Sequence, residues 1–261
     1  NKLKGDFIMA TIKGANSAAA GFEITNSLNF ESSNEANSAW LYKTWGSAGN
    51  QKTYTTSVWF NVDNKNSNKT IFGAGQWPAE PYAIGPQFEG VAAIRWSWRI
   101  AGTSYVKVRN GALSHSTWYH AVTAVDTTAS TAADRIKLYI DGSRLTDFSY
   151  NSGDMGLNLD TGMSAAHQHY IGYEGGLSRW YDGQLAEINV IDGAQLAPTE
   201  FGESIGGTWK AIEYEGDYGT NGYHLDFKDG SDLGGDVSGN GNDWSLNNLD
   251  ANDLSTDVPP Y

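Results

Sequence analysis

The chain contains no cysteine, so neither a disulfide nor a thiolate metal site can form. Basic residues are few: 17 Lys and Arg stand against 30 Asp and Glu, which gives a formal net charge of −13 at pH 7. Because a nucleic-acid backbone is bound by a basic surface, nucleic acid is excluded as an expected partner. Long hydrophobic runs are missing as well, and no segment approaches the ~20 apolar residues of a spanning helix. Membrane insertion is therefore not expected.

Aromatic residues and glycine are abundant, with 10 Trp, 14 Tyr, 9 Phe and 31 Gly among 261 residues. Aromatic side chains favour strands, and glycine favours the tight turns between them. Hydrophobic residues make up 39% of the chain, which is enough for a packed core. The composition therefore predicts a β-rich globular protein.

The pattern of apolar residues predicts six strands, over residues 53–62, 92–100, 118–126, 135–146, 169–173 and 183–192. In the second of them, Trp96 and Trp98 share one face, and Arg95, Ser97 and Arg99 point to the other.

Turn residues separate these strands, and Asp141-Gly142 is typical of a hairpin. Only residues 197–204 predict a short helix, begun by Pro198. Many short strands with turns between them are typical of a two-sheet β-sandwich or jelly roll.

The chain divides into three parts. Lys4-Gly5-Asp6 can be encoded by a string that contains a bacterial ribosome-binding sequence just before Met9, so residues 1–8 are predicted to be translated leader. Residues 9–206 are predicted to form the sandwich. Residues 207–261 are rich in Asp, Asn and Gly, and either close the sandwich or lead into a truncated further domain.

Several segments resemble a known family. WYHAV, KLYIDG and YDGQLAEI, which begin at residues 118, 137 and 181, resemble concanavalin A-like, laminin G-like jelly-roll domains. GAQLAPTEFGE and YGTNGYHLDF resemble the version found in virion structural proteins of tailed, particularly marine, bacteriophages. The resemblance covers residues 27–249 and implies two antiparallel sheets. It implies no single function, because this fold serves adhesins, lectins, hydrolases and architectural modules.

The stretch EINVID nearly matches the Glu-x-Asp-x-x-Glu strand of the laminarinase-type hydrolases in this superfamily. Its three positions hold Glu187, Asn189 and Asp192, so the central acid is an amide here. A retaining glycosidase needs two carboxyl groups ~5–5.5 Å apart. Because residues 187 and 192 of a regular strand point to opposite faces, catalysis would require a bulge that brings Glu187 and Asp192 into one cleft.

A structural strand is the simpler interpretation of the same stretch. Regular alternation puts two sets of residues on opposite faces: Leu185, Glu187, Asn189 and Ile191 on one, and Ala186, Ile188 and Val190 in the core. None of the five histidines lies in a Gly-x-Ser-x-Gly motif, and His120 is predicted to be packed in the core. We therefore predict no catalytic residue.

Sugar binding requires aromatic rings that stack on a sugar face, with polar groups beside them. Most tryptophans in the predicted strands are expected to lie in the core. The candidates in loops are Trp77 and Tyr82, in GQWPAEPYAIG, and Arg179 and Trp180, in GGLSRWYDG. Loops carry binding residues more often than regular elements do, so we predict carbohydrate binding at these four residues.

Calcium is the one cofactor that the sequence predicts. Oxygen-bearing side chains are closely spaced near the end of the chain, at Asp226, Asp236, Asn240, Asn242 and Asp243. Calcium takes six to eight oxygen ligands in a tolerant geometry. The alternative is a turn that is stabilised by its own Asp and Asn side chains.

We expect a non-enzymatic module of a phage virion, on a tail fibre or other appendage, that binds host cell-surface carbohydrate and contacts other virion proteins. Such a protein is made in the host cytoplasm without a signal peptide and acts extracellularly. Two alternatives stay open: an architectural or protein-interaction module of the virion, and a glycoside hydrolase that uses Glu187 and Asp192.

Overall fold

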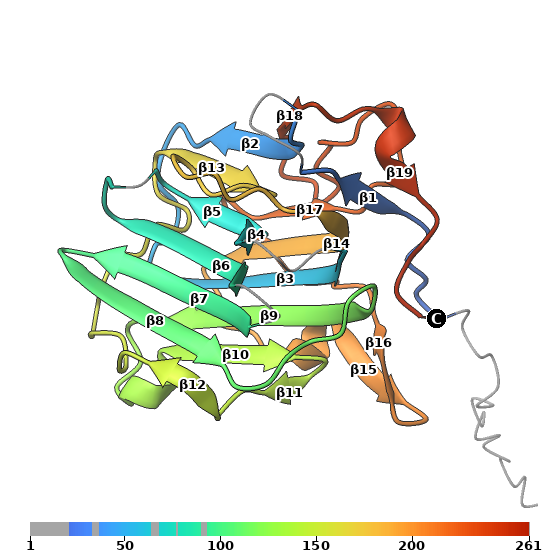
Figure 1. The fold of residues 1–261 in the computed structure, drawn as a ribbon. Coiled ribbons are helices and arrows are strands. Elements are labelled where there is room, and N and C mark those ends of the chain that lie inside the picture. Colours follow the sequence, from blue (N-terminus) through green and yellow to red (C-terminus); the bar gives the residue numbers. More distant parts are fainter. Residues whose placement is uncertain (1–20, 33–36, 64–67, 77, 90–92, 261) are drawn as a thin grey trace, which may run out of the picture.

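The computed structural model describes residues 21–32, 37–63, 68–76, 78–89 and 93–260. Two large antiparallel sheets face each other in it (Figure 1), which confirms the predicted all-β sandwich. The helices of this part of the chain are three short 3-10 turns: η1 (Ala132–Asp134), η2 (Pro198–Glu200) and η3 (Ala251–Asp253). None of these described helices has the length and hydrophobicity that crossing a membrane requires.

The first sheet has eight strands. Their order is β11 (Ser143–Arg144), β10 (Ile136–Ile140), β9 (Trp118–Asp126), β3 (Thr53–Val62), β14 (Gly183–Asp192), β1 (Ser27–Phe30) and β19 (Leu254–Ser255), and β17 (Tyr223–Leu225) pairs with β14.

The second sheet has nine strands. Their order is β12 (Phe148–Asn151), β8 (Thr103–Arg109), β7 (Ala93–Ile100), β6 (Tyr82–Glu89), β5 (Phe72–Ala74), β13 (Gln168–Ile171), β2 (Trp40–Thr44) and β18 (Ser245–Asn247), and β4 (Lys69–Thr70) pairs with β6. A separate hairpin joins β15 (Gly202–Ile205) and β16 (Thr208–Ala211).

The main core lies between the two sheets. Trp96 and Trp98 of β7 are buried in it, as the alternation predicts. Trp96 Nε1 donates a hydrogen bond to Thr123 Oγ1 of β9 at 2.9 Å, and Trp98 Nε1 donates one to the hydroxyl of Tyr54 on β3 at 2.8 Å. A buried indole N–H needs an acceptor. These two bonds therefore fix how the sheets face each other.

Most predicted strands form as expected, and β3, β9 and β14 have the predicted bounds. Asp141-Gly142 joins β10 and β11 with φ values of +46° and +72°, as a tight hairpin requires. The helix predicted over residues 197–204 is wrong, because only η2 forms and Gly202–Ile205 is strand β15. Pairing with β16 supplies the backbone hydrogen bonds that a longer helix would have made.

Strand β14 contains a β-bulge at Glu187, whose φ is +49°. The register against β3 shifts between Ala186 and Asn189, so the predicted regular alternation is wrong. Leu185 and Ile188 both point into the main core, and Ala186 belongs to a cluster on the outer face. An extra residue in one strand reverses the alternation beyond it, which lets both halves of β14 bury apolar side chains in the same core.

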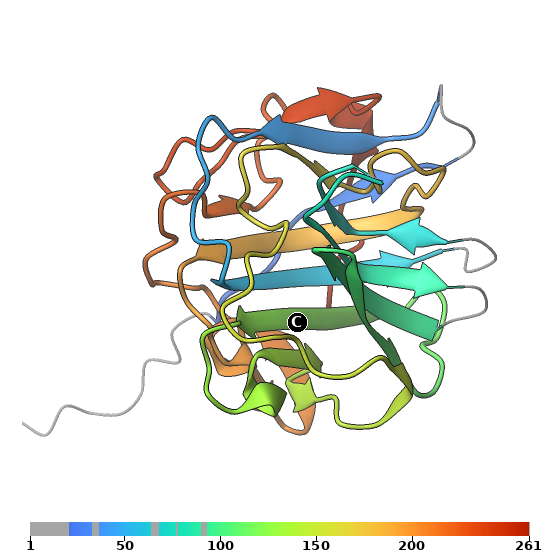
Figure 2. The same ribbon diagram turned by 90° about the vertical axis from the view of Figure 1, so that its left-hand side faces the viewer.

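The residues after 206 contribute strands to both sheets. β17 pairs with β14, β19 with β1, and β18 with β2. Figure 2 shows the red C-terminal segment beside the blue strand β2. This segment is therefore part of the sandwich.

Because β17 is an integral strand, Leu225→Ala should cost about 2–5 kcal/mol of unfolding free energy and leave a single transition in chemical denaturation. Leu225 is fully buried, whereas Leu246 of β18 is 37% exposed. Leu246→Ala is the matched control and should change the unfolding free energy by less than about 0.5 kcal/mol. Equal effects of the two substitutions, or a separate early transition for the C-terminal segment, would contradict this prediction.

Candidate functional site

A tight loop between β13 and β14 carries Arg179 and Trp180. Tyr173 and Trp180 form an isolated antiparallel bridge at its base. Within the loop, the Glu174 N–H donates to Arg179 O at 3.2 Å, and Gly176 N–H donates to the Tyr173 hydroxyl at 3.1 Å. These bonds hold the loop in one conformation, so Arg179 and Trp180 are positioned in advance.

Glu174 fastens this loop to the nine-stranded sheet. Its side chain is buried, and its Oε2 accepts hydrogen bonds from Arg179 Nη1 at 2.9 Å and from Gln87 Nε2 of β6 at 2.7 Å. Thr70 of β4 is a third, longer contact, with its Oγ1 3.5 Å away. A buried carboxylate is tolerated when it is paired and hydrogen-bonded. Glu174 therefore fixes the Arg179 guanidinium against the sheet.

Four aromatic rings gather where this loop meets the sheet. Tyr173 lies nearly parallel to Trp180, with ring centroids 5.9 Å apart and an interplanar angle of 8°. Tyr173 also contacts Trp40 of β2 at 5.2 Å and Tyr170 of β13 at 5.1 Å. The Trp180 and Tyr173 side chains are half-buried, so part of their surface remains open to solvent. Half-exposed rings held by other rings can stack on a flat apolar ligand face at a low entropic cost.

Tyr82, Arg95 and Arg99 lie on the same outer side of the nine-stranded sheet. Tyr82 of β6 is the cross-strand neighbour of Arg99 on β7. Arg95 is the cross-strand neighbour of Gln87, whose side chain donates a hydrogen bond to Glu174. Burial and the Glu174 charge raise the pKa of the Tyr82 hydroxyl, and the charges of Arg95, Arg99 and Arg179 oppose that rise. Gly75, which follows β5, lies against both Tyr82 and Gly175 of the loop, so the loop and these strands adjoin.

We call this site the aromatic–arginine face and define it as Tyr82, Arg95, Arg99, Tyr173, Arg179 and Trp180. Three of the four residues predicted for sugar binding belong to it, and the fourth, Trp77, lies outside the described residues. Beside Tyr82, a pocket of about 250 Å³ opens between Glu80 and His167.

The sequence did not point to Tyr173, Arg95 and Arg99 as residues of this face, nor to Glu174 as the residue that holds Arg179 in place. The two arginines alternate with the core tryptophans of β7, and this alternation marked them as residues of the outer face. Glu174 stands between a strand and a Gly-Gly pair, where nothing in the sequence shows that its partner is on β6.

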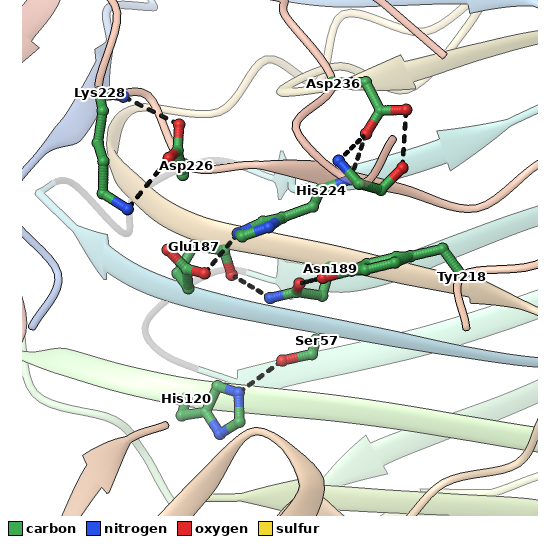
Figure 3. Close-up of polar contacts among 10 residues, drawn as sticks. Ser57, His120, Glu187, Asn189, Tyr218, His224, Asp226, Lys228 and Asp236 are labelled. Carbon is green, nitrogen blue, oxygen red and sulfur yellow. Dashed lines mark hydrogen bonds and ion pairs between the residues drawn. The ribbon is translucent and has the colours of Figure 1, made fainter. Parts of the chain in front are cut away.

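The two acids considered for hydrolysis lie in different surroundings. Glu187 Oε1 is 2.5 Å from His224 Nε2 on β17 (Figure 3). Asp192, at the end of β14, accepts hydrogen bonds from the backbone N–H groups of Asn50 and Asn221. The two carboxyl groups share no partner in the described protein. The bulge that catalysis would require is present. It places Glu187 beside His224, however, while Asp192 accepts hydrogen bonds from the backbone of two loops.

The surroundings of Glu187 form a buried polar cluster on the outer face of the eight-stranded sheet. The Tyr218 hydroxyl donates to Asn189 Oδ1 at 2.6 Å, and the Tyr218 ring stacks on His224 with centroids 6.0 Å apart. Burial, and secondly the Glu187 charge, raise the pKa of Tyr218. All four side chains are buried, so this cluster joins β14, β17 and the loop before β17 and offers no open cleft.

Ser57 and His120 resemble a nucleophile and its base, since Ser57 Oγ lies 2.8 Å from His120 Nε2. The other ring nitrogen, Nδ1, accepts a hydrogen bond from Trp209 Nε1 of β16 at 3.0 Å. An indole N–H only donates, so the proton of a neutral His120 must be on Nε2, which then donates to Ser57. A histidine in this tautomer cannot take the serine proton. The pair is therefore structural.

Among the proposed calcium ligands, Asp236 is hydrogen-bonded to Asn242 and Asp243. Its Oδ1 accepts from the N–H groups of His224 and Ser238, and its Oδ2 accepts from the Ser238 hydroxyl and the Asn242 N–H. Asp243 Oδ1 in turn accepts from the Asp236 N–H at 2.9 Å. These are the bonds of an Asx-rich turn.

The other proposed ligands also have protein partners. Asn240 and Asn242 both donate from Nδ2 to Gly222 O, and Asp226 pairs with Lys228 Nζ at 3.1 Å. In the described part of the chain, no group of three or more His, Asp or Glu side chains is placed to hold a metal ion. Calcium binding here stays a prediction, and it would require these N–H donors to be displaced.

Asp236→Ala tests which interaction organises this loop. The substitution removes the acceptor of four hydrogen bonds and should lower the unfolding free energy by about 1–3 kcal/mol in denaturation curves recorded with a chelator present. Asp229→Ala, in an exposed turn of the same segment, is the control. If Asp236→Ala and wild type were equally stable in chelator and separated only after calcium was added, the carboxylate would be a cation ligand instead.

Burial lowers the pKa of His120 and of His169 to about 3, from 6.5. The unfolded chain takes up these protons below about pH 6.5 and the folded protein does not until near pH 3, so stability falls as the pH falls through this window. Each histidine should contribute a slope of about 1.4 kcal/mol per pH unit.

His120→Gln should therefore reduce the slope of unfolding free energy against pH by about 1.4 kcal/mol per unit in urea titrations between pH 6.5 and 4.5. His115→Gln, at an exposed histidine, is the matched control. An unchanged slope in His120→Gln would contradict the lowered pKa, because it would show that the imidazole takes up its proton over the same pH range in the folded and unfolded states.

Comparisons with known proteins agree with this fold. A putative carbohydrate binding protein from Bacteroides ovatus superposes with a TM-score of 0.60 at 17% sequence identity, over 91% of this chain and 62% of that chain. The heptameric SAP-like pentraxin from Limulus polyphemus has a TM-score of 0.47 at 15% identity, over 67% of this chain and 80% of that one.

The CBM40 of the Ruminococcus gnavus IT-sialidase, solved with α2,3-sialyllactose, has a TM-score of 0.41 at 10% identity, over 60% of this chain and 92% of that one. At 17% identity the likeness to the Bacteroides protein concerns the fold alone. This chain spans 62% of the Bacteroides protein, so that protein's whole activity is not transferred. No curated protein sequence matches significantly.

The model of one protein family matches residues 35–199, which is more than half of the chain. This range contains the core strands β3, β7, β9 and β14 and the aromatic–arginine face. The family is described as the concanavalin A-like lectin/glucanases superfamily. The chain belongs to this superfamily.

Proposed function

We propose that this protein is a non-enzymatic carbohydrate-binding module that binds sugar at the aromatic–arginine face. The observation that carries the proposal is the stacked, half-exposed pair of Trp180 and Tyr173 beside the fixed guanidinium of Arg179. The rings offer an apolar surface for a sugar ring, and the guanidinium donates hydrogen bonds to its hydroxyl or carboxylate oxygens. Membership in a lectin/glucanase superfamily and the likeness to a putative carbohydrate binding protein support it.

The surroundings of the acids and of His120 support binding over hydrolysis. Glu187 and Asp192 bind different partners, and the His120 tautomer does not activate Ser57. The carboxyl pair of a retaining glycosidase must flank one bond. In this proposal these groups stabilise the fold.

The proposal extends to a biological setting, which is based on the sequence resemblance to phage virion proteins. The module would belong to a tail fibre or other appendage, contact other virion proteins there, and bind a glycan of the host cell surface. It would be made in the host cytoplasm and act outside the cell after lysis.

A glycan array with residues 9–261 tests the proposal. We expect binding to one or more surface polysaccharides, and Trp180→Ala should weaken it at least about tenfold because a central aromatic contact is lost. Tyr150→Ala, at a 56% exposed ring on β12, is the control and should bind like wild type. The array is run with calcium and with chelator, so that a calcium requirement appears in the same experiment.

Two results would contradict the proposal. If Trp180→Ala bound as tightly as wild type, the ligand would lie elsewhere on the protein. If no polysaccharide bound, the module would be architectural, and the search would turn to its protein partners.

A further inference from the structure

A second pocket lies on the other sheet. It has a volume of about 610 Å³ and opens on the outer face of the eight-stranded sheet, between the β10–β11 turn and the β15–β16 hairpin. Figure 1 shows this hairpin (orange) beside β9, β10 and β11. Three tryptophans line the pocket: Trp59, Trp118 and Trp209. Ligand pockets for small molecules have volumes of about 300–1,000 Å³.

The Trp209 wall is rigid. Its indole N–H donates to His120 Nδ1, and His120 in turn stacks on Trp59 with centroids 4.9 Å apart. The ring also lies directly against two glycines: a Cβ on Gly142 would be 2.4 Å from it, and a Cβ on Gly202 would be 2.6 Å from it. Any other residue at either position would displace the indole. The glycines therefore seat this ring, and the pocket is formed before a ligand arrives.

Trp118 is a wall that a ligand can reach, and Trp209 opposite the glycines is half-buried as well. Trp118 is half-buried at the start of β9, and its Nε1 donates to Asp257 Oδ1 at 3.2 Å, which fixes the orientation of the ring. Trp59 forms the floor and is only 2% exposed. An open aromatic face above a closed floor is the arrangement that a flat ring stacks on.

The polar lining supplies hydroxyl and carboxylate groups. Asp141, Ser143, Ser204 and Thr208 line the pocket, and Asp141 Oδ1 already accepts a hydrogen bond from the backbone N–H of His120 at 2.8 Å. Among the described lining residues there is no lysine or arginine. Hydroxyl groups both donate and accept, which suits a ligand that carries several hydroxyls, and the lone carboxylate disfavours an anion.

We propose that this tryptophan pocket binds a neutral sugar ring, stacked on Trp118 and hydrogen-bonded to Asp141 and Ser143. The site is independent of the aromatic–arginine face, which lies on the outer side of the other sheet. A chain with both sites would hold glycans on two opposite surfaces. The proposal depends on the pocket geometry and not on the function proposed above.

The indole N–H signals of the ¹⁵N-labelled full chain test the pocket directly, because each tryptophan gives its own signal, assigned by Trp→Phe substitution. The probes are the methyl glycosides of glucose, galactose, mannose and N-acetylglucosamine, with tetramethylammonium as a cationic probe and glucuronate as an anionic one. At least one methyl glycoside should shift the Trp118 signal. Trp118→Ala should weaken that binding at least about tenfold, and Ser143→Ala, at an exposed position that leaves the packing intact, about threefold.

The matched control is Trp180→Ala, which should leave the shift of the Trp118 signal unchanged. The proposal is overturned if none of the four methyl glycosides shifts Trp118, or if only tetramethylammonium or glucuronate does. The same spectra separate the two proposals, because Trp180 reports on the aromatic–arginine face and Trp118 on the pocket. If only the Trp118 indole signal shifts, the result supports the pocket and counts against the aromatic–arginine face. If only the Trp180 indole signal shifts, the result supports the aromatic–arginine face and counts against the pocket.

Discussion

The extra residue in β14 is the constraint on which the rest of the sandwich depends. Before the bulge, β14 pairs with β1, and beyond it with β17, while β3 accompanies it on the other side throughout. Reversing the alternation at Glu187 keeps Leu185 and Ile188 in one core. Glu187 has a backbone conformation in the left-handed region, which costs free energy for a residue other than glycine. In this conformation its carboxylate faces His224. The bulge thus joins the C-terminal strands to the centre of the sheet.

The same geometry places the residues best suited to catalysis against other protein groups. A carboxylate, a histidine and a serine become reactive when their pKa values and tautomers are matched to a substrate cleft. In this protein each of these groups faces another protein group in a buried layer: Glu187 faces His224, and His120 lies between Ser57 and Trp209. The two candidate binding surfaces, by contrast, present half-buried aromatic rings, which are Trp180 and Tyr173 on one and Trp118 on the other.

Local pattern was enough to predict much of this molecule. β3, β9 and β14 follow from apolar periodicity, and Arg179 and Trp180 were singled out because a tryptophan in a Gly-rich loop is hard to bury. Contacts between distant segments could not be predicted in this way. The partner of Glu174 is Gln87 on another strand, and His120 is fixed by Trp209, which follows it by many residues. The bulge in β14 entered the prediction only as a requirement of the hydrolase alternative, because a regular strand and a bulged one have the same sequence pattern and only the pairing partners distinguish them.

The pairing of β1 with β19 has a consequence for the order of synthesis. Ser27, near the beginning of the described chain, lies opposite Ser255, near its end. The eight-stranded sheet cannot be completed on the ribosome until nearly all of these residues have emerged. Contacts so distant in sequence close slowly, because the loop entropy is lost before any contact is gained. Until then the edges of β1 and β2 remain unpaired, in the state most prone to joining a neighbouring chain. The last strands of the chain therefore complete the fold and also protect its edges from aggregation.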